Sequence, residues 1–127
     1  DHIVAGDFPE PESAWCLMES SAMGGPALLS TVRANSALQC LDQLELLLLR
    51  SNNNLTPESA RRAIANGIDI IVHQSSSCTH SPWVAEITRV SGLRNDNFQL
   101  KTVFARQSTG KTEDAPPLSP LEQPNPK

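Results

Sequence analysis

The sequence contains few cysteines and no pattern that would organise them. Its 127 residues include only Cys16, Cys40 and Cys78, an odd number at wide spacing, so we expect reduced thiols and no disulfide framework. Cys78 and His80 stand two positions apart, but no second ligand pair follows at the spacing of a zinc site. We therefore expect a polar loop at this position, without a metal.

Long apolar runs and basic clusters are also missing. The longest apolar run, LELLLL, is interrupted by Glu45 and falls far short of the roughly 20 residues that a membrane-spanning helix needs. With 10 basic and 14 acidic residues the net charge is -4, and the only basic cluster is Arg61-Arg62. Because binding to phosphates needs a positive face, nucleic acid is not expected as a partner.

The start of the chain lacks a signal-peptide pattern, and its first residue is Asp1 in place of methionine. We expect a cytoplasmic chain, and the first residue leaves open that it is a fragment of a longer protein. At this length the chain is expected to form one domain at most.

A phosphate-loop motif is present near the C-terminus, but its surroundings do not support it. Residues 105–112 read ARQSTGKT, which fits a permissive Walker A pattern and follows the strand-like run LKTVFA. Such a loop binds phosphate because it opens into a helix whose first N–H groups are free. The residues that follow here, EDAPPLSPLEQPNPK, contain five prolines and cannot continue as a helix. We interpret the motif as coincidental.

The same prolines set the domain boundary. Residues 108–127 have few large apolar side chains, so they are expected to form a disordered, proline-rich tail. Residues 1–107 are expected to form the folded unit.

Apolar runs and turn signals alternate along the folded unit. Short apolar runs bounded by turns are typical of strands, and apolar residues at every third or fourth position are typical of helices. The pattern predicts strands at 2–6, 27–34 and 68–74, helices at 11–23, 37–50 and 58–66, and a β-hairpin built from 83–93 and 98–105.

Local signals support several of these boundaries. Asn35 or Ser36 is expected to cap the second helix, and Thr56 followed by Pro57 is a strong start for the third. The first strand, at 2–6, is expected to be a buried parallel strand. The order of the elements predicts an α/β protein with a mixed sheet.

Four segments together carry a resemblance to a known family: HIVAGD at 2–7, STVRANSALQCLDQLELLLL at 30–49, ESARRAIANGIDIIVHQS at 58–75 and VAEITRVSGL at 84–93. In order and spacing they resemble the C-terminal half of the motor ATPases of type II and type IV secretion, in the branch of the tight-adherence pilus and conjugation ATPases. HIVAGD resembles the Walker B strand of that family, STVRANS its histidine box and IDIIVHQ a later strand. The resemblance covers residues 2–107.

The resemblance implies a fold and an activity. The fold is a partial RecA-like (P-loop NTPase-type) three-layer domain with a mixed sheet and a C-terminal β-hairpin, missing the Walker A strand and loop. The whole protein would be a hexameric ATPase that uses ATP and magnesium to power secretion or pilus assembly. Its implied partners are other copies of the chain or intact motor subunits, and an inner-membrane platform at which it would be peripheral.

The resemblance also places the functional residues of the family on positions of this chain. The Walker B glutamate falls on Asp7, which is one methylene shorter, and the histidine of the box falls on Arg33. An arginine of the family falls on Pro9, and a second histidine falls on Gly25. Asp7 is therefore the candidate catalytic residue, and Arg33 is the candidate nucleotide-binding residue.

Simpler roles stay open for these residues. Asp7 could cap the helix that follows it, and Arg33 could be a solvated arginine at the end of a strand. His73, at the end of the run IIVH, could be a packed or hydrogen-bonded histidine with no catalytic role.

Two classes of function follow. In the first, the chain is part of a secretion or pilus-assembly motor, to which it supplies the Walker B side and the C-terminal scaffold. In the second, it is a catalytically inactive module that docks onto an intact motor. In both cases the isolated chain is expected to lack ATPase activity, because it has no phosphate loop. The missing strand is also expected to leave 2–6 or the strand after it with an unpaired edge and an uncovered apolar face.

Overall fold

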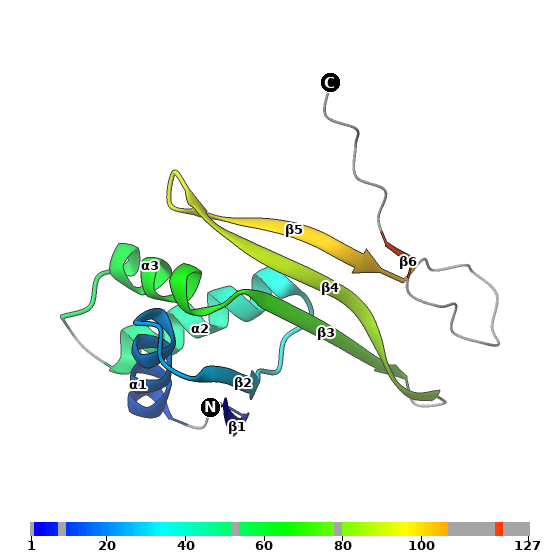
Figure 1. The fold of residues 1–127 in the computed structure, drawn as a ribbon, viewed down its shortest axis with the longest axis horizontal. Coiled ribbons are helices and arrows are strands. Elements are labelled where there is room, and N and C mark those ends of the chain that lie inside the picture. Colours follow the sequence, from blue (N-terminus) through cyan, green and yellow to red (C-terminus); the bar gives the residue numbers. More distant parts are fainter. Residues whose placement is uncertain (1, 8–9, 52–53, 78–79, 107–118, 121–127) are drawn as a thin grey trace.

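The computed structural model describes residues 2–7, 10–51, 54–77, 80–106 and 119–120 of the chain. The first half of this range contains three helices and two strands, and the second half consists of strands (Figure 1). The elements are β1 (His2–Asp7), α1 (Pro11–Ala22), β2 (Ala27–Thr31), α2 (Ala37–Ser51), α3 (Pro57–Gly67), β3 (Ile70–Ser77), β4 (His80–Arg94), β5 (Asn97–Ala105) and β6 (Ser119–Pro120). None of the described helices is long and apolar enough to cross a membrane.

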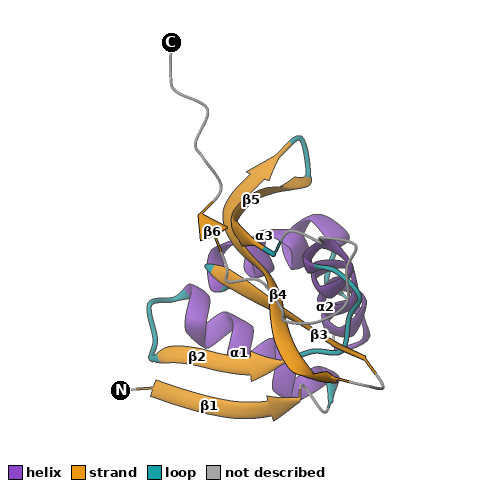
Figure 2. Ribbon diagram, turned by 90° about the vertical axis from the view of Figure 1, so that its right-hand side faces the viewer, coloured by secondary structure: helices purple, strands orange, loops and turns teal. Residues whose placement is uncertain are grey.

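The strands form two separate sheets. β1 and β2 pair in parallel, whereas β3, β4, β5 and β6 form an antiparallel sheet in that order. The two sheets are set apart in Figure 2, where β1 and β2 run side by side beneath α1. The expectation of one mixed sheet is wrong for the described residues, because β3 pairs with β4, its neighbour in sequence, and forms no ladder with β1 or β2. The RecA-like arrangement stays a prediction.

The three helices begin and end where local chemistry favours it. The Oγ of Ser36 accepts a hydrogen bond from the N–H of Gln39, so Ser36 caps the start of α2. Thr56 caps α3 in the same way, by accepting from the N–H of Ser59. After α1 the backbone turns at Gly24, whose φ of +77° suits glycine. The predicted helices are confirmed to within one or two residues at each end.

The core lies where the helices meet one face of the antiparallel sheet. Fully or almost fully buried apolar side chains come from all three helices and from β4: Ala14, Met18, Leu41, Leu44, Leu48, Ala60, Ile64 and Val90. From the sheet, Ile71, Phe98 and Leu100 pack against this cluster. The helices therefore cover one face of β3–β5.

The predicted β-hairpin is confirmed. β4 and β5 pair along most of their length and are joined by Asn95 and Asp96, whose φ angles are 49° and 59°. Two consecutive residues with positive φ are typical of a two-residue hairpin turn whose twist matches that of the strands.

The parallel pair is not buried as expected for β1. Val4 is 75% exposed and Leu29 is 65% exposed, and Ile3 is also exposed. Leu28 of β2 packs against the core, whereas β1 lies one strand farther out and has only β2 as a described partner. The outer position of β1 leaves its apolar side chains in contact with solvent.

Candidate functional site

The structure brings together the two residues that the resemblance singles out. Asp7 ends β1, and Arg33 follows β2 by two residues. Because β1 and β2 are parallel, their carboxyl ends meet at the same edge of the sheet, with Asp7 opposite Thr31 in the register. The Nε of Arg33 lies 3.8 Å from Oδ2 of Asp7, and Thr31 donates a hydrogen bond from Oγ1 to Oδ1 of Asp7.

This cluster forms one wall of a hollow of about 250 Å³. Residues from the middle of α2 also line it, so that strand ends and a helix form the hollow together. The lining residues are Asp7, Thr31, Val32, Arg33, Gln43, Leu44 and Leu47. A small site with two charged side chains and several apolar ones is thus present at the strand ends.

Thr31 and Gln43 are the residues of this site that reasoning from the sequence missed. Thr31 lies inside the STVRANS segment, and the hydroxyl at the end of a predicted strand was a usable signal. Gln43 had no comparable signal, because only the packing of α2 brings it beside the strand ends.

The pairing of Asp7 and Arg33 is exposed to solvent. The side chain of Arg33 is 95% exposed and that of Asp7 is 60% exposed. Water and salt screen such a pair, so it contributes little to folding stability. The exposed guanidinium and carboxylate are instead accessible to a ligand that enters the hollow.

The structure excludes one of the simpler roles of these residues. Asp7 does not cap α1, because Glu10 occupies the N-cap position and no side chain caps that helix. The carboxylate of Asp7 bonds to Thr31 instead. The side chain of Arg33 lies just beyond a strand and is exposed, which fits a solvated arginine and a ligand-binding one equally well. His73 lies opposite Glu86 in the antiparallel sheet and is not among the residues that line the hollow.

The described residues do not fit a complete magnesium–nucleotide site. The hollow offers one carboxylate, which already contacts Thr31 and Arg33, and the part of the chain that the structure describes holds no group of three His, Cys, Asp or Glu side chains suited to a metal. Phosphates are usually held by free N–H groups at a helix start. The lining residues of α2 come from its middle, and no lysine is among the lining residues.

The two other positions of the family pattern do not contribute to this site. Pro9 lies outside the described residues. Gly25 follows α1 and is absent from the lining of the hollow. A Cβ atom at position 25 would lie 2.5 Å from the carbonyl oxygen of Ser20, so only glycine fits the backbone there. A histidine at this position would require the chain after α1 to move.

The ARQSTGKT motif begins at the end of β5. Ala105 is the last residue of that strand, and the N–H of Arg106 donates to the carbonyl oxygen of Ala85 at 2.9 Å. Residues 107–112 lie outside the described residues. Most of the predicted tail lies outside them as well, apart from Ser119–Pro120, which pairs as β6 with Phe104 and Ala105. The predictions for the motif and the tail therefore stay predictions.

The chain is an α/β protein with a polar cluster at the carboxyl ends of two parallel strands. No family model matches it. Over 101 residues it is 28% identical to the conjugal transfer protein TrbB of Rhizobium radiobacter, a match that covers 80% of this chain and 29% of that protein. The chain thus spans less than a third of the length of the relative that it matches.

Proposed function

We propose that the chain is part of the nucleotide-driven motor of a conjugal transfer or related secretion system. The observation that carries this proposal is the meeting of Asp7 and Arg33 at the hollow, because the resemblance puts a catalytic acid at position 7 and a nucleotide-binding residue at position 33. The similarity to a conjugal transfer protein supports the same system.

In this proposal the chain supplies one side of the nucleotide site and the scaffold behind it. Asp7 takes the position of the acid at the end of the Walker B strand, and Arg33 presents a cation toward the phosphates. The lysine and the main-chain N–H groups that bind the phosphates in a phosphate loop would come from another segment. That segment would add a strand to β1 and β2 and complete a RecA-like domain. The assembled protein would bind ATP and magnesium, form a ring of identical subunits and act in the cytoplasm at an inner-membrane platform.

A second candidate function is a non-catalytic module that docks onto an intact motor. The contacts of Asp7 favour this module. Its carboxylate accepts a hydrogen bond from Thr31 and lies beside the positive charge of Arg33, so its negative charge is compensated without a metal. Asp7 is also one methylene shorter than the glutamate of the family, and catalytic carboxylates tolerate little displacement.

Both functions predict that the isolated chain does not hydrolyse ATP. Phosphate release is measured with the purified chain, ATP and magnesium, and compared with a blank without protein. The Lys111→Ala variant tests the ARQSTGKT motif in the same assay. Release above the blank that disappears in the Lys111→Ala variant would refute the proposal and show that this motif is a working phosphate loop.

The reading frame upstream of Asp1 separates the two functions. A G-x-x-x-x-G-K-[ST] segment between a strand and a helix would support the motor. A start codon close to Asp1 would support the module. In the motor, Asp7→Asn in the full-length protein is expected to abolish DNA transfer between cells, whereas in the module the same change is expected to leave transfer intact.

A further inference from the structure

The antiparallel sheet has one face that no described helix covers. The helices pack on the face that carries Ile71, Val90 and Leu100, so neighbouring residues in the strands point to the other side. The strand register aligns two rows of side chains there, one formed by Val72, Ile87 and Phe104 and the other by Ile70, Arg89 and Lys101. We call these six residues the open face.

The open face is apolar in one row and positively charged in the other. Ile70 is 59% exposed and Val72 is 50% exposed, although both are large apolar side chains; they lie on β3, the edge strand of this sheet. Arg89 and Lys101 stand directly opposite each other in the register of β4 and β5. Like charges in opposed positions destabilise a strand pair. Neither residue takes part in an ion pair among the described residues, and neither row contains an acid.

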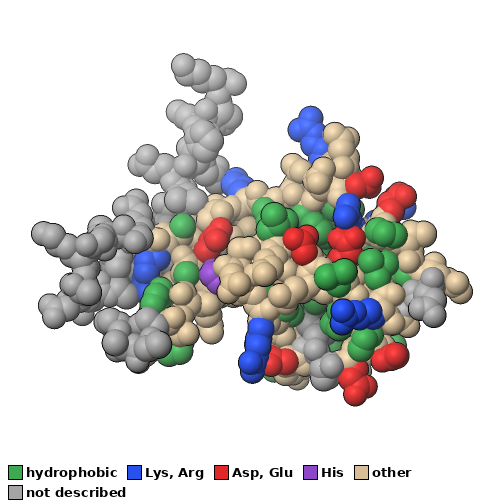
Figure 3. Space-filling view, turned by 180° about the vertical axis from the view of Figure 1, so that it is seen from behind, with side chains coloured by type: hydrophobic (Ala, Val, Ile, Leu, Met, Phe, Trp, Pro, Cys, Tyr) green, Lys and Arg blue, Asp and Glu red, His purple; other side chains and the backbone are tan. Residues whose placement is uncertain are grey.

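A complementary surface lies on the outside of α2. Leu38, Asp42 and Leu46 are spaced four residues apart, so they lie on one side of the helix. Leu38 is 52% exposed and Leu46 is 57% exposed, and Asp42 is exposed between them. We call these three residues the α2 stripe. On the side of the molecule turned away in Figure 1, hydrophobic side chains reach the surface among acidic and basic ones (Figure 3).

The two surfaces match in length as well as in chemistry. The α2 stripe extends over eight residue steps and therefore roughly 12 Å at the rise of an α-helix. A row of the open face crosses three strands and therefore about 10 Å. A helix laid along the rows can place two leucines on the apolar row and the carboxylate between them beside two cations.

We propose that the α2 stripe of one copy docks on the open face of a second copy. Leu38 and Leu46 then cover Val72 and its neighbours in the apolar row, and Asp42 neutralises Arg89 and Lys101. Because the two surfaces differ, the contact is head-to-tail, and repeating it builds a ring or an open chain of subunits. This inference rests on the charges and exposure of the two surfaces and does not depend on the proposed nucleotide site.

Sedimentation velocity over a concentration series tests the contact. Two variants reverse its charges: Arg89→Glu/Lys101→Glu on the open face and Asp42→Lys on the α2 stripe. Each is expected to weaken self-association by about tenfold or more, because like charges then face each other across the contact. Glu12→Lys, on the exposed part of α1, makes the same charge change as Asp42→Lys; it is the matched control for that variant and is expected to associate as the unchanged chain does. Circular dichroism checks that every variant is folded.

Mixing the two charge-reversed variants gives the decisive result. In the mixture, contacts between the two variants pair opposite charges, whereas contacts within either variant pair like charges. The mixture is therefore expected to associate about as strongly as the unchanged chain. The proposal is overturned if the unchanged chain stays monomeric up to sub-millimolar concentration, if the control weakens association as much as the reversals do, or if the mixture associates no better than its components.

Discussion

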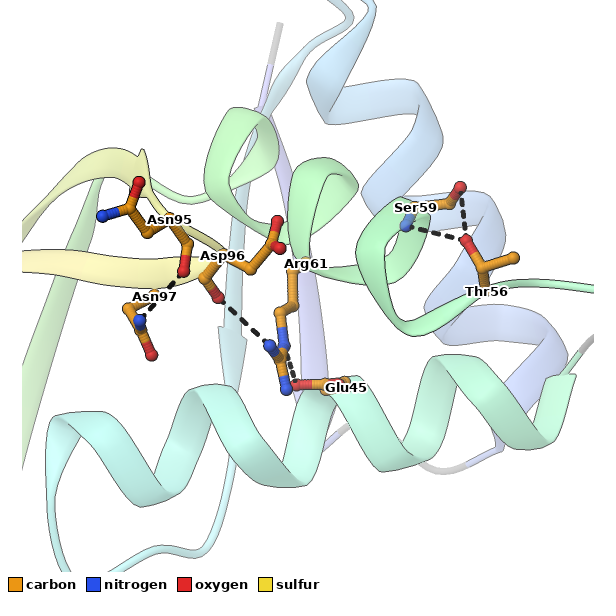
Figure 4. Close-up of polar contacts among 7 residues, drawn as sticks. All are labelled: Glu45, Thr56, Ser59, Arg61, Asn95, Asp96 and Asn97. Carbon is orange, nitrogen blue, oxygen red and sulfur yellow. Dashed lines mark hydrogen bonds and ion pairs between the residues drawn. The ribbon is translucent and has the colours of Figure 1, made fainter.

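Arg61 of α3 donates from Nε to Oε2 of Glu45 in α2 at 2.8 Å (Figure 4). The same guanidinium donates from Nη1 to the main-chain oxygen of Asp96 at 3.1 Å, in the turn between β4 and β5. The pKa of Arg61 is raised above its ordinary value. The hydrogen bond to Glu45 and the negative charge of Glu45 raise it, and they outweigh the lowering caused by desolvation. The side chain of Arg61 thus links α3 to α2 and to the turn of the hairpin.

Replacing Arg61 by methionine is expected to lower the melting temperature by several degrees. The side chain of Glu45 is only 11% exposed, and without Arg61 its carboxylate stays buried and unpaired. Thermal unfolding followed by circular dichroism measures the change. The double variant Arg61→Met/Glu45→Leu is expected to recover most of the loss, because it removes the buried charge as well.

Arg62→Met is the matched control for this prediction. Arg62 pairs with Glu58 one turn away in α3, but both side chains are more than 60% exposed. Such a pair contributes little to stability, so the melting temperature is expected to stay nearly unchanged. An equal loss in Arg62→Met and Arg61→Met would contradict the role assigned to Glu45.

Thr56→Ala is expected to destabilise the chain by about 1 kcal/mol, because it removes the side-chain cap of α3. Denaturant unfolding measures the change. Thr56→Ser keeps the hydroxyl group and is expected to unfold close to the unchanged chain. If the serine variant loses as much as the alanine variant, the methyl group of Thr56 and not its hydroxyl is responsible.

Cys40 is expected to react with a maleimide more slowly than Cys16 in the folded chain. Cys16 is exposed, whereas burial raises the pKa of the Cys40 thiol and so reduces the reactive thiolate. The two rates are compared in single-cysteine variants that also lack Cys78, in which serine replaces the other thiols. In denaturant the rates should become equal.

The raised pKa of Cys40 also predicts a dependence of stability on pH. The unfolded thiol ionises at its ordinary pKa, which lies below the pKa of the folded thiol because burial raises the latter. The stability that Cys40 contributes is therefore complete below the ordinary pKa and is lost as the pH rises above it. Cys40→Ala is expected to remove this alkaline component, and a pH profile that is identical in both proteins would rule it out.

The sequence predicted the elements better than it predicted their arrangement. Thr56 and Ser36 cap helices locally, and Asn95 and Asp96 form a local turn. The helices and the hairpin could therefore be predicted from the sequence. The division of the strands into two sheets could not be predicted in this way. Whether β3 pairs with β4 or with a strand of the first sheet depends on contacts between segments that are far apart in the sequence. For the same reason the exposure of β1 was missed.

The candidate site was predicted in part. The positions of Asp7 and Arg33 followed from the resemblance, and parallel pairing of β1 with β2 brings them together. The contribution of α2 depends on how the helix packs against the strand ends, which no periodicity in the sequence specifies.

Deleting residues 110–127 is expected to leave the melting temperature unchanged within error. In this segment the structure describes Ser119–Pro120, which adds two residues to the edge of β5, and Pro120 has no N–H to donate. Ordering each residue costs roughly 1–2 kcal/mol, which a segment so rich in proline and poor in apolar side chains does not offset. A deletion that also removes Phe104 and Ala105 is the control and is expected to destabilise, because these residues pair with β4. A clear loss on the shorter deletion would show that the tail docks.

The amide hydrogens of β1 and β2 are expected to exchange with solvent much faster than those in the middle of β4. A two-stranded sheet with exposed apolar side chains buries little apolar surface, so little stabilises it against local unfolding. Val4, for example, is 75% exposed. β4 instead pairs on both sides and carries the buried Val90. Hydrogen–deuterium exchange read by mass spectrometry compares peptides that cover 2–7 and 27–31 with one that covers 86–91. Denaturant unfolding is expected to show a matching early loss in the parallel pair. Equal protection of both sheets, together with a single cooperative transition, would show that β1 and β2 are stable without a further strand, and the need for another segment at their edge would fall away.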